Sequence, residues 1–248
     1  MPKACAYCGG GGPLTREHIW PNGFLKRDGF DIKFSRRANR AFRGDLTISD
    51  VCGKCNNGPL SRLDQHACEL YDRRFGKRVS AGDIVTFTYD YGTLMRWLLK
   101  VSYNSARTTG QDVEVLARYR ETILSDDPCS PIGAVAFLST ISPSLMANRE
   151  TGQSKLIYPE AGRCGPMVLP GSQVEELVVL RCVMINAFNF TLVIDKSSTS
   201  LKRHLAPILS RVPGQALDPS GRMRVGPPSI PAHVALRGIE NWPRLGQR

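Results

Sequence analysis

Four cysteines fall into two pairs with the same short spacing. Cys5 and Cys8 form one C-x-x-C pair, and Cys52 and Cys55 form a second pair after 43 intervening residues. Each pair places two thiolates on one tight turn, and four thiolates complete the tetrahedral shell that Zn²⁺ prefers, at about 2.3 Å per bond. A shell of four sulfurs leaves no open position for water, so the spacing predicts a structural zinc site.

The alternative interpretation is that the four residues are reduced cysteines packed without a metal. Paired spacing makes that arrangement improbable, and the chain is longer and poorer in cysteine than a secreted disulfide scaffold. The remaining cysteines have no partner at such spacing, and we interpret them as ordinary small core residues: Cys68, Cys129, Cys164 and Cys182.

Three residues next to the cysteine pairs carry groups that could hydrolyse a phosphodiester. Glu17 and His18 lie between the pairs, and Asn56 follows the second pair directly. The reaction requires a base that takes a proton from water and a cation that stabilises the departing oxygen. Mg²⁺ prefers oxygen ligands and keeps several waters, so one or two protein oxygens suffice. In an extended segment Glu17 and His18 point to opposite sides, so that one can hold a metal while the other faces the water.

The combined pattern of residues 5–66 is C-x-x-C, L-T-R-E-H-I-W-P, C-x-x-C-N-N and S-R-L-D. It resembles the HNH endonuclease superfamily, in particular the bacterial and phage branch with an E-H-I-x-P core and a C-N-N second knuckle. The resemblance covers about a quarter of the chain. It implies a ββα-metal fold in which His18 is the general base and Glu17 and Asn56 bind the catalytic Mg²⁺ or Mn²⁺. Three basic residues near the motifs are candidate contacts to the flanking phosphates: Arg16, Lys54 and Arg62.

One position departs from the family pattern. The family's middle Asn, which orients the base, stands about five residues before the third zinc cysteine, and this chain has Thr47 there with Asp45 and Asp50 nearby. A threonine can hydrogen-bond an imidazole or a carbonyl, so the role can survive, or it can have lapsed and left an inactive fold. Asn56, in turn, could serve only as a helix cap.

The charge of the chain is +11 and unevenly distributed. Residues 1–80 hold 15 Lys/Arg and 8 Asp/Glu, residues 201–248 hold 8 and 2, and residues 81–200 hold 10 and 12. Positive charge at both ends favours a polyanionic partner, nucleic acid first, because phosphates release counterions when Lys and Arg replace them. The HNH resemblance implies DNA as that nucleic acid. A basic surface that serves solubility alone is the alternative. A protein partner or a homodimer stays open.

The sequence predicts neither a secretory signal nor a membrane span. The N-terminus, MPKACAYCGGGG, has no apolar stretch of the secretory kind, and the chain has no run of about 18 apolar residues. We therefore expect no membrane contact and a cytoplasmic location.

The fold class predicted is α+β, with an HNH unit over residues 1–80 and a mixed α/β domain over residues 81–248. The second domain would position substrate, recognise a target or dock a partner, and it ends in a basic tail rich in Pro and Gly. Apolar periodicity and β-branched runs predict the following elements: an extended piece 15–20, a strand 46–51, a helix from 55 to about 74, a strand 84–89, helices 91–107 and 112–124, a strand 135–139 and a hairpin of 174–186 with 188–194.

The function expected from these observations is a metal-dependent endonuclease, in phage defence, restriction or DNA processing. Two rival interpretations are a zinc-stabilised nucleic-acid-binding module without catalysis and a nuclease effector gated by a partner.

Overall fold

The structure is a computed structural model that describes residues 4–27, 32–35, 40–43, 46–127, 131–147, 151–169, 174–197, 205–228 and 230–235. It is a mixed α/β fold in which helices and strands lie largely in separate regions, as the α+β prediction requires. Within the described ranges, no helix is long and apolar enough to cross a membrane.

The N-terminal region is built on a pair of antiparallel strands. Strand β1 (Leu14–His18) pairs with β4 (Thr47–Cys52), and the chain between them forms the short helix α1 (Asn22–Leu25) and the hairpin of β2 (Ile32–Ser35) and β3 (Arg40–Arg43). Both strands of the pair fall on segments predicted to be extended.

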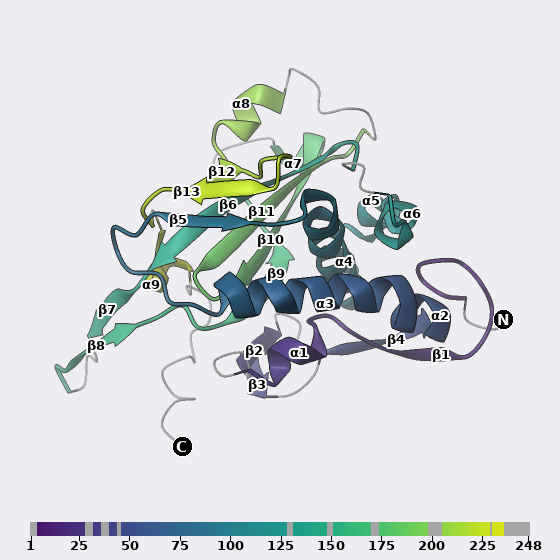
Figure 1. The fold of residues 1–248 in the computed structure, drawn as a ribbon, viewed down its shortest axis with the longest axis horizontal. Helices are drawn as coiled ribbons and strands as arrows, with labels where there is room; N and C mark the ends of the chain where they lie inside the picture. The colour runs from purple at the N-terminus through teal and green to yellow at the C-terminus, as the bar shows by residue number, and fades with distance from the viewer. Residues whose placement is uncertain are drawn as a thin grey trace.

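A long helical segment follows β4 directly. It consists of α2 (Gly53–Cys55), the wider turn η1 (Asn56–Leu60), α3 (Ser61–Leu70) and η2 (Tyr71–Phe75). Gly58 has non-helical backbone angles before Pro59, so the helix is offset within its first turns. The end at Phe75 agrees with the predicted end near Arg74. Figure 1 shows α3 running across the molecule with β1 and β4 along one side of it.

Helix α4 (Tyr91–Thr109) is the centre of the fold. The Asp90 side chain accepts a hydrogen bond from the backbone N–H of Thr93 at the start of the helix, and Gly110 ends it in the left-handed conformation, with φ of 79°. Its side chains from Gly92 to Ala106 are almost all buried, because α3 packs on one side and strands of the main sheet on another. A helix buried on all sides must satisfy its polar side chains inside the protein.

The main sheet has the strand order β12-β6-β11-β10-β9, and β14 (Ile230–Pro231) pairs with β6 in parallel. The other neighbouring strands pair antiparallel, and β10 and β11 form the predicted hairpin around Asn186 and Ala187. The bounds are β6 (Ala134–Ser142), β9 (Gly162–Pro166), β10 (Val178–Ile185), β11 (Phe188–Asp195) and β12 (Gln215–Ala216).

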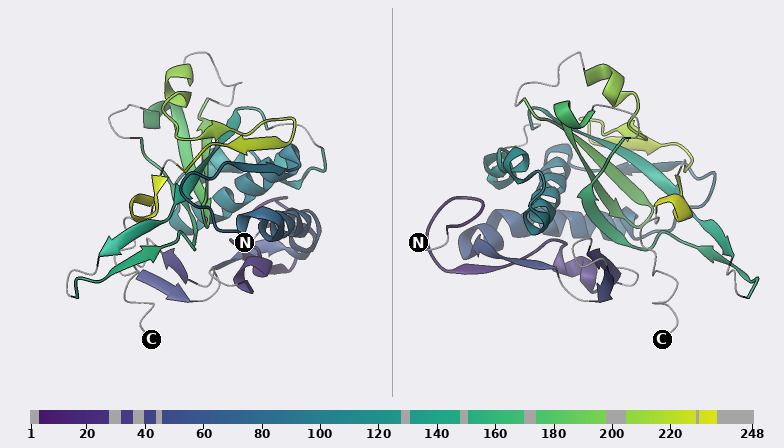
Figure 2. Two further views of the ribbon diagram at one scale, coloured as in Figure 1. Left: turned by 60° about the vertical axis from the view of Figure 1, so that its left-hand side comes forward. Right: turned by 180° about the vertical axis from the view of Figure 1, so that it is seen from behind.

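Two smaller strand pairs complete the β-structure. Strand β5 (Val85–Thr88) pairs with β13 (Arg222–Val225). Strand β7 (Ser144–Ala147) pairs with β8 (Ser154–Ile157), and this hairpin projects from the body of the molecule in every view of Figures 1 and 2.

Two predictions about elements after residue 81 need correction. The predicted hairpin strand from Val174 begins only at Val178, because residues 174–177 form the short helix α7 (Val174–Leu177). The predicted helix 112–124 is divided into α5 (Val113–Ala117) and α6 (Arg120–Leu124). The basic tail contains α8 (Ala206–Leu209), β12, β13, β14 and α9 (Ala232–Ala235) among its described residues.

One hydrophobic core joins the predicted N-terminal unit to the rest of the chain. The same cluster of buried side chains includes Cys5 and Tyr7 beside the cysteine pairs, Trp97 in α4 and Phe188 in the sheet. Trp97, Tyr103 and Phe188 are all buried in this core. The cysteine pairs therefore lie on a continuous core, and a boundary at residue 80 does not separate two cores.

Candidate metal centre and active site

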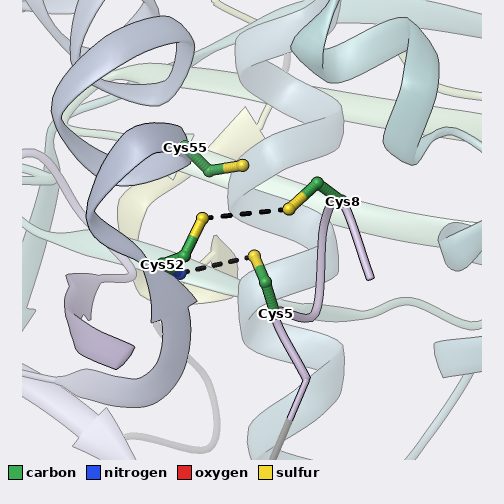
Figure 3. Close-up of side chains that lie close together, drawn as sticks. All are labelled: Cys5, Cys8, Cys52 and Cys55. Carbon is green, nitrogen blue, oxygen red and sulfur yellow. Dashed lines mark hydrogen bonds between the residues drawn. The ribbon is translucent and has the colours of Figure 1, made fainter. Parts of the chain in front are cut away.

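The four paired cysteines form one cluster. The sulfurs of Cys5, Cys8, Cys52 and Cys55 all lie within 4.8 Å of one another, and Figure 3 shows them pointing toward a common centre. The sulfurs of Cys8 and Cys52 are 3.8 Å apart. Sulfurs bound to one zinc ion at about 2.3 Å stand roughly 3.8 Å from each other. The cluster could therefore hold a metal ion such as zinc, as the spacing predicts.

The thiols of the cluster differ in how readily they lose a proton. Burial alone would raise the pKa of Cys5, but N–H donors from Cys52, Cys8 and Tyr7 together lower it to about 6. Burial and the neighbouring thiols raise the pKa of Cys55. A metal binds cysteine as thiolate, so the backbone donors around Cys5 prepare the first ligand.

The first cysteine turn is fixed to helix α4 by polar contacts. The hydroxyl of Tyr7 donates to Oδ1 of Asn104 over 2.6 Å, and its ring meets the ring of Tyr103 edge-on at 5.3 Å. Arg107 lies over both rings and donates to Asp50 of β4 over 2.7 Å. Helix α4 therefore positions both the first cysteine turn and the strand that carries Cys52.

The pairing of β1 with β4 places the predicted base, His18, opposite Thr47, the position at which the chain departs from the HNH pattern. The Cα atom of His18 is paired with that of Thr47, and Glu17 is paired with Ile48. Both His18 and Thr47 are half-buried. The register shifts between Thr15 and Glu17, so β1 contains an irregularity just before these residues. Thr47 thus lies opposite His18, where the family resemblance expects an asparagine.

Asn56 connects the start of the helical segment to β1. Its Nδ2 atom donates to Oγ1 of Thr15 and to the carbonyl of Arg16, each over 2.8 Å. Because Nδ2 faces the strand, Oδ1 is the atom of this amide that can serve as a metal ligand. The side chain bridges helix and strand and caps neither of the adjoining helical turns.

Glu17 points into the protein. Its side chain is 3% exposed, and Oε1 lies 2.6 Å from Nζ of Lys100, whose side chain is fully buried. Nδ2 of Asn104 donates to the same oxygen over 3.2 Å. Oε1 of the carboxylate that the family resemblance assigns to a divalent cation is already paired with an ammonium group. In this arrangement Glu17 does not fit a divalent cation.

Lys100 is shared between two carboxylates. Its Nζ donates to both oxygens of Asp64 over 2.8 Å, and Nε1 of Trp97 donates to Oδ1 of Asp64 over 3.2 Å. Burial alone would lower the pKa of Lys100, but the charges of Asp64 and Glu17 raise it. Burial raises the pKa of Asp64, although Lys100 opposes this. The ammonium group is therefore held charged by its two partners.

Lys100 and Asn104 also reach the backbone of the predicted base. The carbonyl of His18 accepts from Nζ of Lys100 over 3.4 Å and from Nδ2 of Asn104 over 3.2 Å. The end of β1 is thus fixed by two side chains that lie more than 80 residues away in the sequence.

Comparisons of the chain with protein-family models, with curated proteins and with solved structures found no match.

The predicted phosphate contacts lie at the surface. Arg16 and Lys54 are exposed. Arg62 is also exposed, and its guanidinium donates to the carboxylate of Asp126 over 2.8 and 3.0 Å. Only Arg16 lies in β1 beside the candidate base. These side chains could bind phosphates at the surface. To do so, Arg62 would exchange the carboxylate of Asp126 for a phosphate.

The other described histidines are His66 and His233. His66 is half-buried, and burial lowers its pKa. His233 is exposed. Cys68, Cys164 and Cys182 are half-buried rather than fully buried. Two residues considered from sequence, Asp45 and Cys129, lie outside the described residues.

Sequence reasoning missed Lys100, Asn104 and Asp64. A signal was present, since Arg96, Lys100 and Asn104 recur every fourth residue and so form one polar stripe along a helix whose other sides are apolar. Asp64 belongs to the S-x-L-D motif itself. A polar stripe normally indicates a solvated face, and only the packing of α4 against β1 and α3 shows that it is buried.

Proposed function

We propose that this chain is a metal-dependent endonuclease of the HNH type that hydrolyses phosphodiester bonds of nucleic acid, DNA in the first place. The observation that carries the proposal is the order strand, strand, helix around the four-cysteine cluster. In that order His18 ends the first strand opposite Thr47, and Asn56 lies in the first turns of the helical segment with its amide bonded to β1. This is the order of elements that a ββα-metal unit requires.

In the proposed reaction, His18 takes the proton from the attacking water. Thr47 offers a hydroxyl across the strand pair, where it can orient the imidazole. A bound Mg²⁺ or Mn²⁺ would stabilise the charge on the departing oxygen. Oδ1 of Asn56 is an oxygen of the right kind for such an ion, whereas Glu17 must first be released from Lys100.

A basic surface supports nucleic acid as the substrate. The chain carries a net charge of +11, and Arg16 and Lys54 are exposed near the ends of β1 and β4. Lys and Arg bind phosphate with little regard to base identity, so the expected binding is salt-dependent. The contexts of phage defence, restriction and DNA processing are all consistent with this activity.

A second candidate function is a zinc-stabilised nucleic-acid-binding module without catalysis. The observation that favours it is the ion pair between Glu17 and Lys100, which occupies a carboxylate expected to bind metal. Thr47, which stands where the HNH pattern has asparagine, also favours this module. This module would bind DNA through the same basic residues and leave it intact.

Plasmid cleavage separates the two functions. Zinc-loaded protein is incubated with supercoiled plasmid and either Mg²⁺ or Mn²⁺, for the wild type, His18→Ala and the control His233→Ala. The nuclease predicts nicking by the wild type, a loss of about 10²- to 10⁴-fold in His18→Ala, and wild-type activity in His233→Ala. DNA binding by all three proteins with no cleavage by any would establish the binding module instead.

A further inference from the structure

A surface cavity of about 240 Å³ lies just beyond the end of the long helical segment, which starts at the second cysteine pair. It is lined by two stretches of chain, 76–79 and 158–160, and by Asn186 and Ala187 at the turn between β10 and β11. Sites for drug-sized ligands measure about 300–1,000 Å³, so this smaller cavity suits a single ring system. None of its residues belongs to the cysteine cluster or to the candidate active site.

Arg78 is held in place at this cavity although it is exposed. Its guanidinium lies over the ring of Tyr158, with Cζ 4.2 Å from the ring centroid. Its Nε donates to Oε1 of Glu160 over 2.8 Å, and its Nη2 lies 2.7 Å from the same oxygen. Even so, 63% of the Arg78 side chain is exposed. The ring and the carboxylate therefore orient a planar cation whose other face is open to a ligand.

A nucleic-acid base fits these groups. Bases stack on aromatic rings and on guanidinium planes. Tyr158 and Arg78 already form such a stack, and a base on the open face of the guanidinium would extend it. Both contacts of Arg78 go to Oε1 of Glu160, so Oε2 remains an acceptor for the amino group of a base. A free phosphate fits less well, because the carboxylate of Glu160 would repel it.

The chain beside the cavity is strongly basic. Residues 73–78 contain four cations: Arg73, Arg74, Lys77 and Arg78. Interaction with the carbonyl end of the helix accounts for Arg73 and Arg74, which lie in its last turn. It does not account for Lys77 and Arg78, which follow the helix and line the cavity. Such cations attract the phosphates of a nucleic-acid strand.

The combination of cations and a cavity favours an unpaired strand over a duplex. In a duplex the bases are stacked and paired inside, and a base enters a protein cavity only after it has left that stack. A single strand can place its phosphates against the cations and turn a base toward the protein at the same time.

We propose that this cavity binds an unpaired base of a nucleic-acid strand, with the base stacked on Arg78 and a neighbouring phosphate beside Lys77. The inference goes beyond the proposed function, because it assigns a second contact to nucleic acid and requires no catalysis. At about 1.5 Å per residue, the helical segment from Asn56 to Phe75 spans up to about 30 Å. The base bound here is thus remote from the bond that His18 would help to cut.

The test is binding of a fluorescently labelled oligodeoxycytidylate to the zinc-loaded full chain, followed by fluorescence anisotropy. The salt concentration is fixed, the pH is neutral, and neither Mg²⁺ nor Mn²⁺ is present. An abasic strand of the same length provides the same phosphates without bases. The wild type should bind the oligodeoxycytidylate at least about fivefold more tightly than the abasic strand, because stacking adds to the attraction of the phosphates.

Arg78→Lys separates stacking from charge, because lysine keeps the positive charge but has no guanidinium plane. We expect it to lower the affinity for the oligodeoxycytidylate at least about fivefold and to leave the affinity for the abasic strand unchanged. Arg73→Lys is the matched control, since Arg73 is an exposed arginine that does not line the cavity. It should bind both strands as the wild type does.

Two variants of Tyr158 test the support of the guanidinium. Tyr158→Phe keeps the ring and should bind as the wild type does, whereas Tyr158→Ala should lose affinity for the oligodeoxycytidylate alone. Far-ultraviolet circular dichroism establishes that each variant is folded. If Tyr158→Ala is unfolded, the exposed substitution Arg78→Lys decides.

Equal affinity of the wild type for the two strands would overturn the proposal, because phosphates alone would then account for binding. Undiminished binding of the oligodeoxycytidylate by Arg78→Lys, or a loss of the same size in Arg73→Lys, would also overturn it. Plasmid cleavage gives a separate answer. Base-dependent binding by a chain that cleaves nothing refutes the nuclease and supports this inference, and cleavage without base-dependent binding does the opposite.

Discussion

Helix α4 is shared by two regions that are stabilised in different ways. The region around β1 and β4 meets it through charges and hydrogen bonds, among them the ion pair of Lys100 with Glu17 and the bond from Tyr7 to Asn104. The sheet region relies mainly on apolar packing, although buried Arg181 of β10 donates to the carbonyl of Ser102 and to Oγ of Ser105 in α4. All eight residues of β11 are buried, and the rings of Phe75 and Phe188 lie 4.9 Å apart.

The two kinds of contact have different effects: one fixes the positions of groups, and the other stabilises the fold. Apolar packing contributes most of the favourable free energy of folding but is not directional. Buried ion pairs and hydrogen bonds fix positions, and they contribute little net stability because the groups lose their hydration. Directional contacts fix the end of β1 at His18, and apolar contacts predominate in the sheet.

Removing the metal from the cysteine cluster should give the largest effect. We expect Cys52→Ser to abolish zinc binding, measured as zinc per chain, and to expose the amides of β1 and β4 to hydrogen exchange. The reason is that the free energy of zinc binding at a four-thiolate site contributes directly to folding. In zinc-finger peptides it amounts to about 10–16 kcal/mol. Cys164→Ser is the control and should keep its zinc. Equal exchange in β1 with and without zinc would contradict the role of the cluster.

Lys100→Met should give the next largest effect. It leaves Glu17 and Asp64 buried without their cation, and removing one partner of a buried pair costs about 3–5 kcal/mol. Urea unfolding measures this. Adding Glu17→Gln and Asp64→Asn should restore part of the loss, because the buried charges then disappear together. A loss no larger than that of an exposed lysine such as Lys54→Met would show that the cluster is not coupled.

Ile194→Val tests the apolar region. The side chain lies in the fully buried strand β11, and the loss of one methylene should cost about 0.5–1.5 kcal/mol in urea unfolding. Plasmid cleavage by the folded variant should be unchanged, in contrast to variants of the polar region. A loss of cleavage without a loss of stability would mean that the sheet region also positions the site.

The smallest effect is expected at the surface. The hydrogen bond from Arg27 lowers the pKa of Asp72, so this carboxylate stabilises the fold at pH values above its unfolded pKa and loses that effect as the pH falls through the folded value. Because the pair is largely exposed and screened, Asp72→Asn should cost less than about 1 kcal/mol at pH 7, and still less at an acidic pH that protonates Asp72. Urea unfolding at both pH values measures the difference, and an equal cost at both would contradict the ion pair as its source.

The cysteine cluster could be predicted from sequence because its geometry is local. Each C-x-x-C turn fixes two sulfurs by itself, so only the meeting of the two turns required the fold, and the structure brings all four sulfurs together. The strand ending at Cys52 and the helix after Cys55 were equally local, since their apolar spacing is visible in the chain.

The environment of Glu17 could not be predicted in the same way. Its partners Lys100 and Asn104 lie more than 80 residues away, and a lysine in an amphipathic helix is normally expected at the surface. The division of helix 112–124 and the helix at 174–177 also depended on tertiary packing and end effects, which periodicity does not register. Local geometry was predictable, and the pairing of distant charges was not.

The segment between β1 and β4 can vary in length without shifting the register of these two strands. The chain leaves the pair at His18 and returns at Thr47, directly opposite, and the cysteine turns hold the strands at their other end. Lengthening such a closed segment costs only about 0.6 kcal/mol for each doubling. The hairpin of β2 and β3 can therefore be exchanged for a longer or shorter insert while the frame of β1, β4 and the cysteine turns stays in place.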